Sequence, residues 1–284
     1  MGDSIQMTDV QGRVAFITGG GNGIGLGMAR AFARAGASLA LSDIDDEALA
    51  RAKAELGAIA PVETFRLDVR DRDAYAAAAD AAEARLGPVS LLFNNAGVSG
   101  AFPADRLTYE LWDWSIGTNL GGVINGIRTF LPRIMERGEG GHIVNTASGA
   151  GLAATGSGVL YCTAKFGVVG LSESMGPELA ASGVGVTLLC PGPVATDIVQ
   201  RSADATPLAG LSLSAEEQQQ RAERVTMMTA ALKASADADE VGDLVLKAVL
   251  ENRFYVHTDR MMEERIAART QALLDAMPAL EPAR

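Results

Sequence analysis

Residues 14–25 read VAFITGGGNGIG, a short apolar run that passes directly into a glycine-rich loop. This order predicts a buried strand, a tight turn and the start of a helix. Because glycine has no Cβ, the backbone N–H groups of such a loop and of the helix N-terminus can approach a pyrophosphate. The loop reads T-G-x-x-x-G-I-G rather than G-x-G-x-x-G, and it lacks the Gly-Lys-Ser/Thr ending of a P-loop. We expect it to bind a dinucleotide, with a simple glycine-rich turn as the alternative. The expected contacts are Gly19, Gly21, Asn22, Gly23 and Ile24.

Outward from this loop, apolar runs with strand character alternate with helical patterns. Continuous apolar runs are typical of parallel strands covered by helices on both faces. Strands are expected at Val14–Thr18, Ser38–Ser42, Glu63–Leu67, Ser90–Asn94, His142–Thr146, Val184–Cys190 and Phe254–His257. Helices are expected around 23–36, 45–56, 71–86, 108–137, 158–182 and 237–251. The alternation predicts an α/β fold with a Rossmann-type, doubly wound parallel sheet of about seven strands, as one domain over residues 10–257.

Two segments lie outside this alternation. Residues 198–236 insert a polar stretch, SAEEQQQRAERV, after the sixth expected strand. Open α/β sheets bind ligands at the carboxyl ends of their strands, so we predict a substrate lid here, with a surface helical hairpin as the alternative. Residues 258–284 follow the last strand and are amphipathic, which predicts a C-terminal helical extension.

Composition excludes several function classes. The 284 residues include 24 Lys and Arg against 35 Asp and Glu, a formal net charge of −11 that argues against a nucleic-acid-binding protein with a broad basic face. Two cysteines cannot build a disulfide framework, and two histidines leave little for a metal site. His142 opens an expected strand and is expected to be partly exposed there. No apolar run has the length of a signal peptide core or a membrane span. We expect a cytoplasmic protein that binds neither membrane nor metal.

Asp43 ends the second expected strand, where a Rossmann-type site meets the adenosine ribose. A carboxylate there accepts hydrogen bonds from the ribose hydroxyls and repels a 2′-phosphate. No Arg or Lys lies in the glycine loop or at position 44 to offset that charge. The sequence therefore predicts NAD rather than NADP as the cofactor.

Tyr161 and Lys165 are four residues apart on an expected helix, so both side chains lie on one face. A tyrosine has a pKa near 10, and a nearby ammonium favours the phenolate that a general base requires. Such pairs also arise by chance, but here Ser148 follows the fifth expected strand and Asn119 lies in the preceding helix. The four residues meet where the crevice of the sheet is expected.

Together these features resemble the short-chain dehydrogenase/reductase family, in its single-domain branch. The resemblance covers roughly residues 10–257 and rests on TGGGNGIG at 18–25, Asp43, LDV at 67–69, NNAG at 94–97, Asn119, Ser148, YCTAK at 161–165 and PGPVAT at 191–196. It implies a catalytic domain in which Tyr161 is the general acid/base, Lys165 lowers its pKa and binds the nicotinamide ribose, Ser148 binds the substrate oxygen and Asn119 anchors a water in a proton relay.

The resemblance also implies the remaining cofactor contacts. Asp68 and Val69 are expected to hold the adenine, and Val194 and Thr196 the carboxamide. Asn95 is expected to contact the adenosine-side ribose region through its backbone. The flanking motif residues Ala96, Gly97, Pro191 and Gly192 complete the expected cofactor site. The family further implies a homo-oligomer, a dimer or a tetramer, with the helices at 108–137 and 158–182 packed against other copies.

The expected substrate pocket is apolar and carries few charges, which favours an apolar or aromatic secondary alcohol over a sugar or a carboxylate. Its candidate residues are Phe102, Ser148, Leu152, Val159, Tyr161, Ile198 and Met227. The run YCTAKFGVVGLSES, the turn LCPGPV and the extended C-terminus resemble dehydrogenases of bulky aryl alcohols, including those that oxidise lignin-derived aryl ethers. Three alternatives remain: a hydroxysteroid-type dehydrogenase, a 3-oxoacyl-carrier-protein reductase, and a non-catalytic protein that senses NAD.

Overall fold

A computed structural model describes residues 8–207 and 213–278. Its centre is one seven-stranded parallel sheet with the order β3-β2-β1-β4-β5-β6-β7. The strands are β1 (Val14–Thr18), β2 (Ser38–Asp43), β3 (Val62–Arg66), β4 (Val89–Asn94), β5 (Gly141–Thr146), β6 (Val184–Cys190) and β7 (Tyr255–His257). The order reverses between β1 and β4, and such a switch point is where doubly wound sheets bind ligands. The Rossmann-type prediction is confirmed, and no strand bound shifts by more than one residue.

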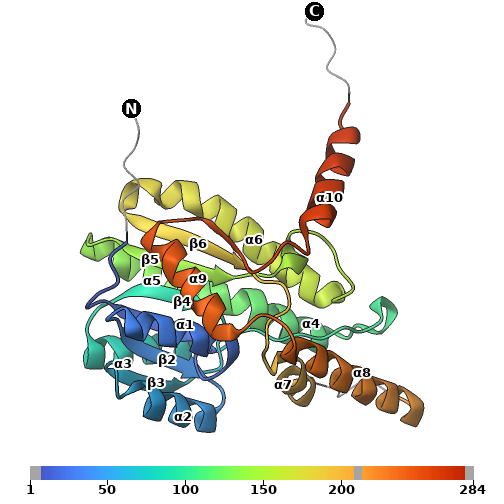
Figure 1. The fold of residues 1–284 in the computed structure, drawn as a ribbon, viewed down its shortest axis with the longest axis horizontal. Helices are drawn as coiled ribbons and strands as arrows, with labels where there is room; N and C mark the ends of the chain where they lie inside the picture. Colours follow the sequence, from blue (N-terminus) through green and yellow to red (C-terminus); the bar gives the residue numbers. More distant parts are fainter. Residues whose placement is uncertain (1–7, 208–212, 279–284) are drawn as a thin grey trace, which may run out of the picture.

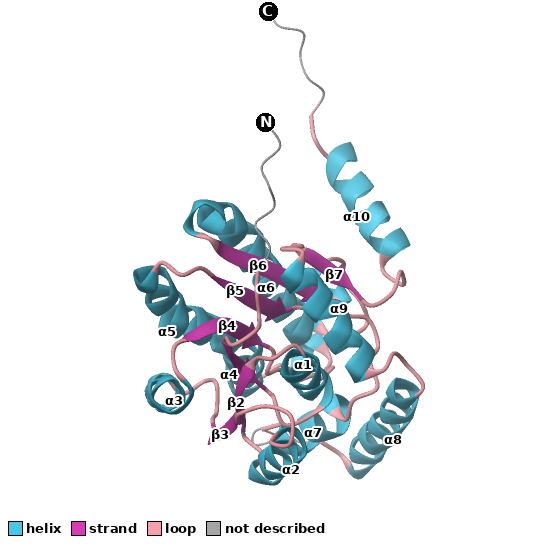
Figure 2. Ribbon diagram, turned by 60° about the vertical axis from the view of Figure 1, so that its left-hand side comes forward, coloured by secondary structure: helices cyan, strands magenta, loops and turns pink. Residues whose placement is uncertain are grey.

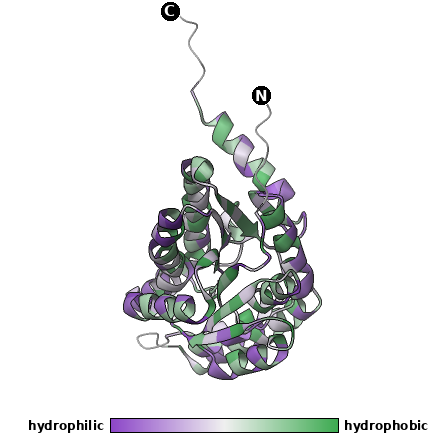
Figure 3. Ribbon diagram, turned by 90° about the vertical axis from the view of Figure 1, so that its left-hand side faces the viewer, coloured by the Kyte–Doolittle hydropathy of each residue, from purple (hydrophilic) through white to green (hydrophobic). Residues whose placement is uncertain are grey.

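Helices cover both faces of the sheet (Figures 1 and 2). One face packs against α1 (Gly23–Arg34), α2 (Asp46–Leu56) and α9 (Ala238–Leu250). The other packs against α3 (Arg72–Leu86), α5 (Gly122–Arg137) and α6 (Val159–Leu179). In β1, Ala15 and Ile17 join the first core while Phe16 joins the second, because successive strand side chains point to opposite faces. Apolar residues therefore gather along the strands and the inner sides of the helices (Figure 3).

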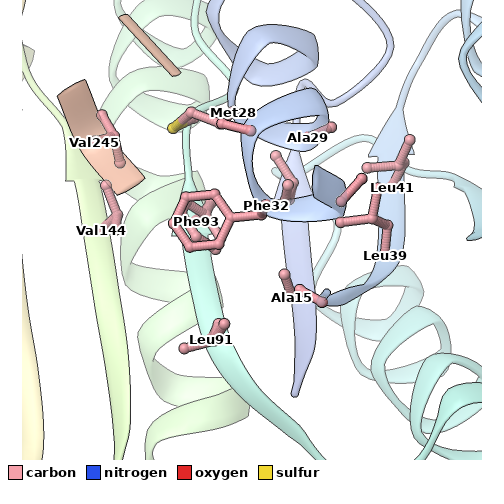
Figure 4. Close-up of a cluster of buried hydrophobic side chains, with 14 of the residues drawn as sticks. Ala15, Met28, Ala29, Phe32, Leu39, Leu41, Leu91, Phe93, Val144 and Val245 are labelled. Carbon is pink, nitrogen blue, oxygen red and sulfur yellow. The ribbon is translucent and has the colours of Figure 1, made fainter. Parts of the chain in front are cut away.

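The first core fixes α1 beneath the glycine loop. Phe32 from α1 packs edge-on against Phe93 from β4, with ring centroids 4.7 Å apart, and Met28 and Val245 lie beside them (Figure 4). Gly27 lets α9 approach closely, since a Cβ there would lie 2.0 Å from the carbonyl oxygen of Ala238. This packing sets the position of the α1 N-terminus at the sheet's carboxyl edge.

The helix expected over 108–137 is interrupted. It comprises α4 (Tyr109–Ile116), a π-helical turn at Gly117–Gly121, and α5. The fully buried Asn119 lies in that turn, where its side-chain nitrogen donates to the Ser115 carbonyl at 3.0 Å. Single π-turns inside α-helices are frequent at functional sites. The hydrophobic period of the sequence does not indicate this π-turn, because the turn adds only one residue to the helical repeat.

The two segments outside the alternation are helical. Residues 198–236 contain α7 (Ile198–Ala205) and α8 (Ala215–Lys233), whose polar face explains why α8 buries no residue. Residues 258–284 contain α10 (Glu263–Asp275), which projects from the body of the molecule (Figure 1). Among the described residues, no helix is both long enough and apolar enough to cross a membrane.

Candidate active site

The glycine loop forms a cradle of bare backbone at the carboxyl end of β1. A Cβ on Gly25 would lie 2.1 Å from the Gly19 carbonyl oxygen, and one on Gly23 would lie 2.9 Å from the Thr196 side chain. Gly19 and Gly23 also adopt positive φ angles of 64° and 50°, which L side chains avoid. The first turn of α1 holds no acidic residue and its N-cap Asn22 makes no side-chain cap. Its N–H groups are therefore available to an anion, as a pyrophosphate requires.

Asp43 is buried directly beside this cradle. One of its carboxylate oxygens accepts from the Gly21 N–H at 3.3 Å, and the other accepts from the Asp45 N–H at 3.2 Å. The second oxygen also pairs with the Arg201 guanidinium at 3.1 Å. The expectation that no cation offsets Asp43 is therefore wrong, because α7 brings Arg201 across from a position 158 residues away in the sequence.

The NNAG segment links the glycine loop to the catalytic residues. The hydroxyl of Thr18 accepts from the N–H groups of Asn95 at 2.9 Å and Ala96 at 3.0 Å. Gly97 faces the opposite way, since a Cβ there would lie 2.9 Å from the Asn119 side-chain oxygen and 3.6 Å from Lys165 Nζ. The segment therefore lies between the glycine loop and the Asn119 and Lys165 side chains.

The turn after β6 forms the far wall of the cradle. Pro191 accepts from the Gly149 N–H at 3.0 Å, and the Gly192 N–H donates to the Thr258 hydroxyl at 2.9 Å. Val194 is buried and pairs as an isolated bridge with Ala236. The turn is thereby fixed on both sides, with Thr196 held against the glycine loop.

Asp68 and Val69 follow β3, at the other end of the expected cofactor site. Asp68 forms hydrogen bonds with Arg70, which hold the pKa of its carboxyl below its usual range. The side chain of Val69 packs in the core against Gly122, and its carbonyl accepts from the Asn125 side chain at 2.8 Å. The structure places both residues at the sheet's carboxyl edge but gives their side chains these other partners.

Tyr161 and Lys165 lie one turn apart on α6, at the bottom of the crevice. Lys165 Nζ lies 5.6 Å from the centroid of the Tyr161 ring and donates to the Thr146 carbonyl at 2.8 Å. Lys165 is only 3% exposed. Ser148 follows β5 and is positioned by its own turn, accepting from the Ala150 N–H at 3.2 Å. Asn119 donates to the Val98 carbonyl at 3.0 Å and accepts from the Val98 N–H at 3.1 Å, which ties the π-turn to the loop after β4.

Burial dominates the titration of this pair. It raises the pKa of the Tyr161 phenol above its usual value of 10, while a hydrogen bond with Ser148 acts in the opposite direction. Burial lowers the pKa of Lys165 to about 8. The expected lowering of the tyrosine pKa is therefore not found in this structure, because both groups are desolvated and desolvation disfavours each charged form.

A cavity of about 600 Å³ opens above Ser148 and Tyr161, within the usual size range of small-molecule pockets. Phe102 and Ile198 line it, as expected from the sequence. The other apolar lining residues include Val199, Val225, Met228, Leu232, Met261 and Met262. Arg106, Glu217, Arg221 and Arg224 also line it, so the expectation of few charges holds for the inner end but not for the end beside α8.

Three expected pocket residues lie away from this cavity. Leu152 packs against a buried cluster around Val168 and Leu188 instead. Val159 begins α6 and is 44% exposed, and Met227 lies on the outer side of α8 and is 67% exposed. None of the three lines the cavity in this structure. For Val159 and Met227 the reason is the helix face, which decides where a side chain points, whereas Leu152 lies in a turn and packs inward.

Sequence reasoning missed several contributors that come from distant segments. Met228, the neighbour of Met227, faces the cavity. Met262 reaches it from the C-terminal extension and lies against Gly149. The helical period of α8 could have separated the two methionines, but nothing local to residue 262 indicates a site. Within the described residues, no group of His, Cys, Asp and Glu is arranged to hold a metal ion.

Comparison with known proteins agrees with this geometry. Residues 13–207 match the family model described as short chain dehydrogenase. The chain is 34% identical over 277 residues to a C alpha-dehydrogenase of Sphingobium sp. strain SYK-6, covering 97% of this chain and 90% of that one. It is 37% identical over 189 residues to 3beta-hydroxysteroid dehydrogenase 2 of Eggerthella lenta, covering 66% and 73%.

A solved structure is similar over nearly the whole chain. It is a short chain dehydrogenase/reductase from Burkholderia phymatum in complex with NAD, with a TM-score of 0.88, 34% identity, and coverage of 98% of this chain and 100% of that one. The family model alone spans more than half of the 284 residues. The chain therefore belongs to the short chain dehydrogenase family.

Proposed function

We propose that this protein is an NAD-dependent oxidoreductase that interconverts a bulky, apolar or aromatic secondary alcohol and its ketone. The observation that carries the proposal is that Ser148, Tyr161 and Ile24 of the glycine loop line one largely apolar cavity. The similar structure from Burkholderia phymatum is in complex with NAD, which supports the choice of cofactor. The C alpha-dehydrogenase relative supports a dehydrogenase activity, and the resemblance of YCTAKFGVVGLSES and LCPGPV to dehydrogenases of bulky aryl alcohols favours an aryl substrate.

The residues of this chain divide the chemistry among them. NAD, when bound, supplies the hydride acceptor for the carbinol C–H bond. The Tyr161 oxygen takes the proton of the alcohol hydroxyl during oxidation and returns it to the ketone oxygen during reduction. The Ser148 hydroxyl orients the substrate oxygen toward that phenol. Oxidation thus releases one hydride and one proton from the substrate, and each has an acceptor.

Lys165 and Asn119 are proposed to support this proton transfer. The pKa of Lys165 is about 8, so below this pH its ammonium places a positive charge close to the phenol. This charge stabilises the phenolate form of Tyr161 while the substrate oxygen carries the proton. Asn119 has its side-chain oxygen and nitrogen fixed by Val98 and Ser115. This arrangement holds the π-turn in place, and the role of Asn119 as anchor of a water relay rests on the family resemblance.

Several further assignments belong to the same proposal. Residues 10–257 form the cofactor-binding and catalytic domain, 198–236 act as a lid, and 258–284 extend it. We place the protein in the cytoplasm, where its two free cysteines, Cys162 and Cys190, would remain reduced. We also propose a homo-oligomer, because the family resemblance implies assembly through the helices at 108–137 and 158–182.

A panel of alcohols tests the proposal. NAD reduction is followed spectrophotometrically with bulky aryl secondary alcohols, steroids and short aliphatic alcohols, and each assay is repeated with NADP. We expect turnover with the aryl alcohols and NAD. Turnover confined to steroids would favour the hydroxysteroid alternative, which the Eggerthella lenta relative supports. Binding of NAD without turnover of any alcohol would favour the sensor.

A further inference from the structure

Arg201 connects the lid segment to the ribose end of the proposed cofactor site. Its guanidinium lies 3.1 Å from an Asp43 oxygen and 3.5 Å from an Asp45 oxygen. With the Asn22 amide in the orientation that satisfies both of its polar atoms, the Asn22 oxygen accepts from the same guanidinium at 2.7 Å. A single side chain from α7 thus contacts the glycine loop, Asp43 at the end of β2 and Asp45 just after it.

The helix that carries Arg201 is held independently of these contacts. The neighbouring Ser202 is buried, and its hydroxyl accepts from the Ser99 N–H at 2.8 Å. Val199 is buried on the same helix and lines the substrate cavity. The guanidinium is therefore delivered to Asp43 by a helix fixed elsewhere, so it is preorganised at this position.

Asp43 has too few lone pairs for every donor that competes for it. A carboxylate offers about four acceptor positions. Three donors already use them in this structure, namely the N–H groups of Gly21 and Asp45 and the Arg201 guanidinium. The two hydroxyls of an adenosine ribose need two positions. Arg201 and the ribose of NAD therefore compete for the same carboxylate.

A 2′-phosphate in place of the 2′-hydroxyl reverses the role of Arg201. Asp43 and Asp45 alone would repel it with two negative charges, whereas with Arg201 the three groups carry one net negative charge. A guanidinium also binds phosphate oxygens through paired N–H bonds. The cation that hinders the ribose of NAD thus assists the phosphate of NADP.

We propose that Arg201 is a specificity-determining residue that weakens the preference of this site for NAD over NADP. Asp43 sets the direction of that preference, and Arg201 reduces its size by competing with one cofactor and binding the other. The proposal rests on the proposed cofactor site at Asp43. It assigns to a residue of the lid a role in cofactor choice.

Calorimetric binding of four ligands tests the proposal without any turnover. NAD, NADP and their ribose-end fragments, adenosine 5′-monophosphate and adenosine 2′,5′-bisphosphate, are titrated into the parent protein and into Arg201→Ala. We expect Arg201→Ala to bind NAD and the monophosphate more tightly, and NADP and the bisphosphate more weakly. The ratio of the two affinities is expected to change by about tenfold, the size of one charge-assisted hydrogen bond.

Controls separate this effect from general damage. Arg34→Ala removes an exposed ion pair with Asp243 on the outer side of α1 and is expected to leave the ratio unchanged. Arg201→Lys keeps the charge and is expected to retain part of the bisphosphate binding. In an Asp43→Asn background, Arg201→Ala is expected to lose its benefit to the monophosphate. An unchanged ratio, or equal weakening of all four ligands, would overturn the role of Arg201 alone. Failure of the parent to bind NAD or the monophosphate would overturn the proposed function together with it.

Discussion

At the scale of single residues, Tyr161 and Lys165 show that a sequence pattern can predict the position of a side chain but not its pKa. The four-residue spacing correctly places both side chains on one face of α6, at the bottom of the crevice. The direction of the tyrosine pKa shift could not be obtained in this way, because it depends on desolvation by surrounding segments rather than on the neighbouring charge alone.

His142 is a second residue whose environment differs from the expected one. It is 1% exposed rather than partly exposed, because β5 lies between β4 and β6 in the middle of the sheet. Its ring nitrogens lie 2.8 Å from the Thr187 hydroxyl and 3.1 Å from the Thr8 hydroxyl. Burial lowers the pKa of His142 to about 3.

This burial makes the stability of the protein sensitive to acid. Between pH 6.5 and about 3 the unfolded chain binds a proton at His142 and the folded chain does not, so stability is lost as the pH falls through this window. One such proton corresponds to about 1.4 kcal/mol per pH unit. We expect His142→Asn to reduce the slope of unfolding free energy against pH by about this amount, measured by urea denaturation between pH 6 and 4. His257→Asn, at an exposed residue, is the matched control, and equal slopes in all three proteins would contradict the expectation.

At the scale of elements, the helical period of the sequence predicts where a helix lies. It predicts less well which side chains of that helix contact a ligand site. The extension after β7 contains a helix, as its amphipathic pattern predicts, and the segment predicted to be a lid contains the helices α7 and α8. The contact of Arg201 with Asp43 and that of Met262 with Gly149 depend on how these helices pack against distant segments. The local sequence pattern does not indicate such long-range contacts, so the sequence analysis did not predict either of them.

Met227 and Met228 provide a matched pair on α8. Met228 lines the substrate cavity, whereas Met227 lies on the outer side of the same helix. We expect Met228→Ala to raise the KM for bulky aryl alcohols several-fold, because it removes apolar contact area from the cavity wall. Met227→Ala is expected to leave KM unchanged. Steady-state kinetics on one aryl alcohol compares the two variants, and equal effects would show that α8 does not contact the substrate.

At the scale of the whole molecule, the sheet order explains why so much of the site could be predicted. The glycine loop, the NNAG segment, Ser148 and the PGPVAT turn each follow a strand, and the parallel order places the carboxyl ends of β1, β4, β5 and β6 side by side. Residues carried by these strand ends, such as Thr18, Asn95 and Ser148, therefore converge as expected. Residues carried by the lid and the extension reach the site from outside the sheet, and strand periodicity does not determine their positions.

The central claim is that this chain moves a hydride and a proton between an alcohol and NAD, with Tyr161 as the acid/base. Comparison of Tyr161→Phe with the parent, measuring both NAD reduction on an aryl secondary alcohol and NAD binding by calorimetry, tests it most directly. We expect turnover to fall by about 10² to 10⁴-fold, the usual contribution of general acid–base catalysis, while the dissociation constant for NAD changes little. Turnover within a few-fold of the parent would contradict the claim.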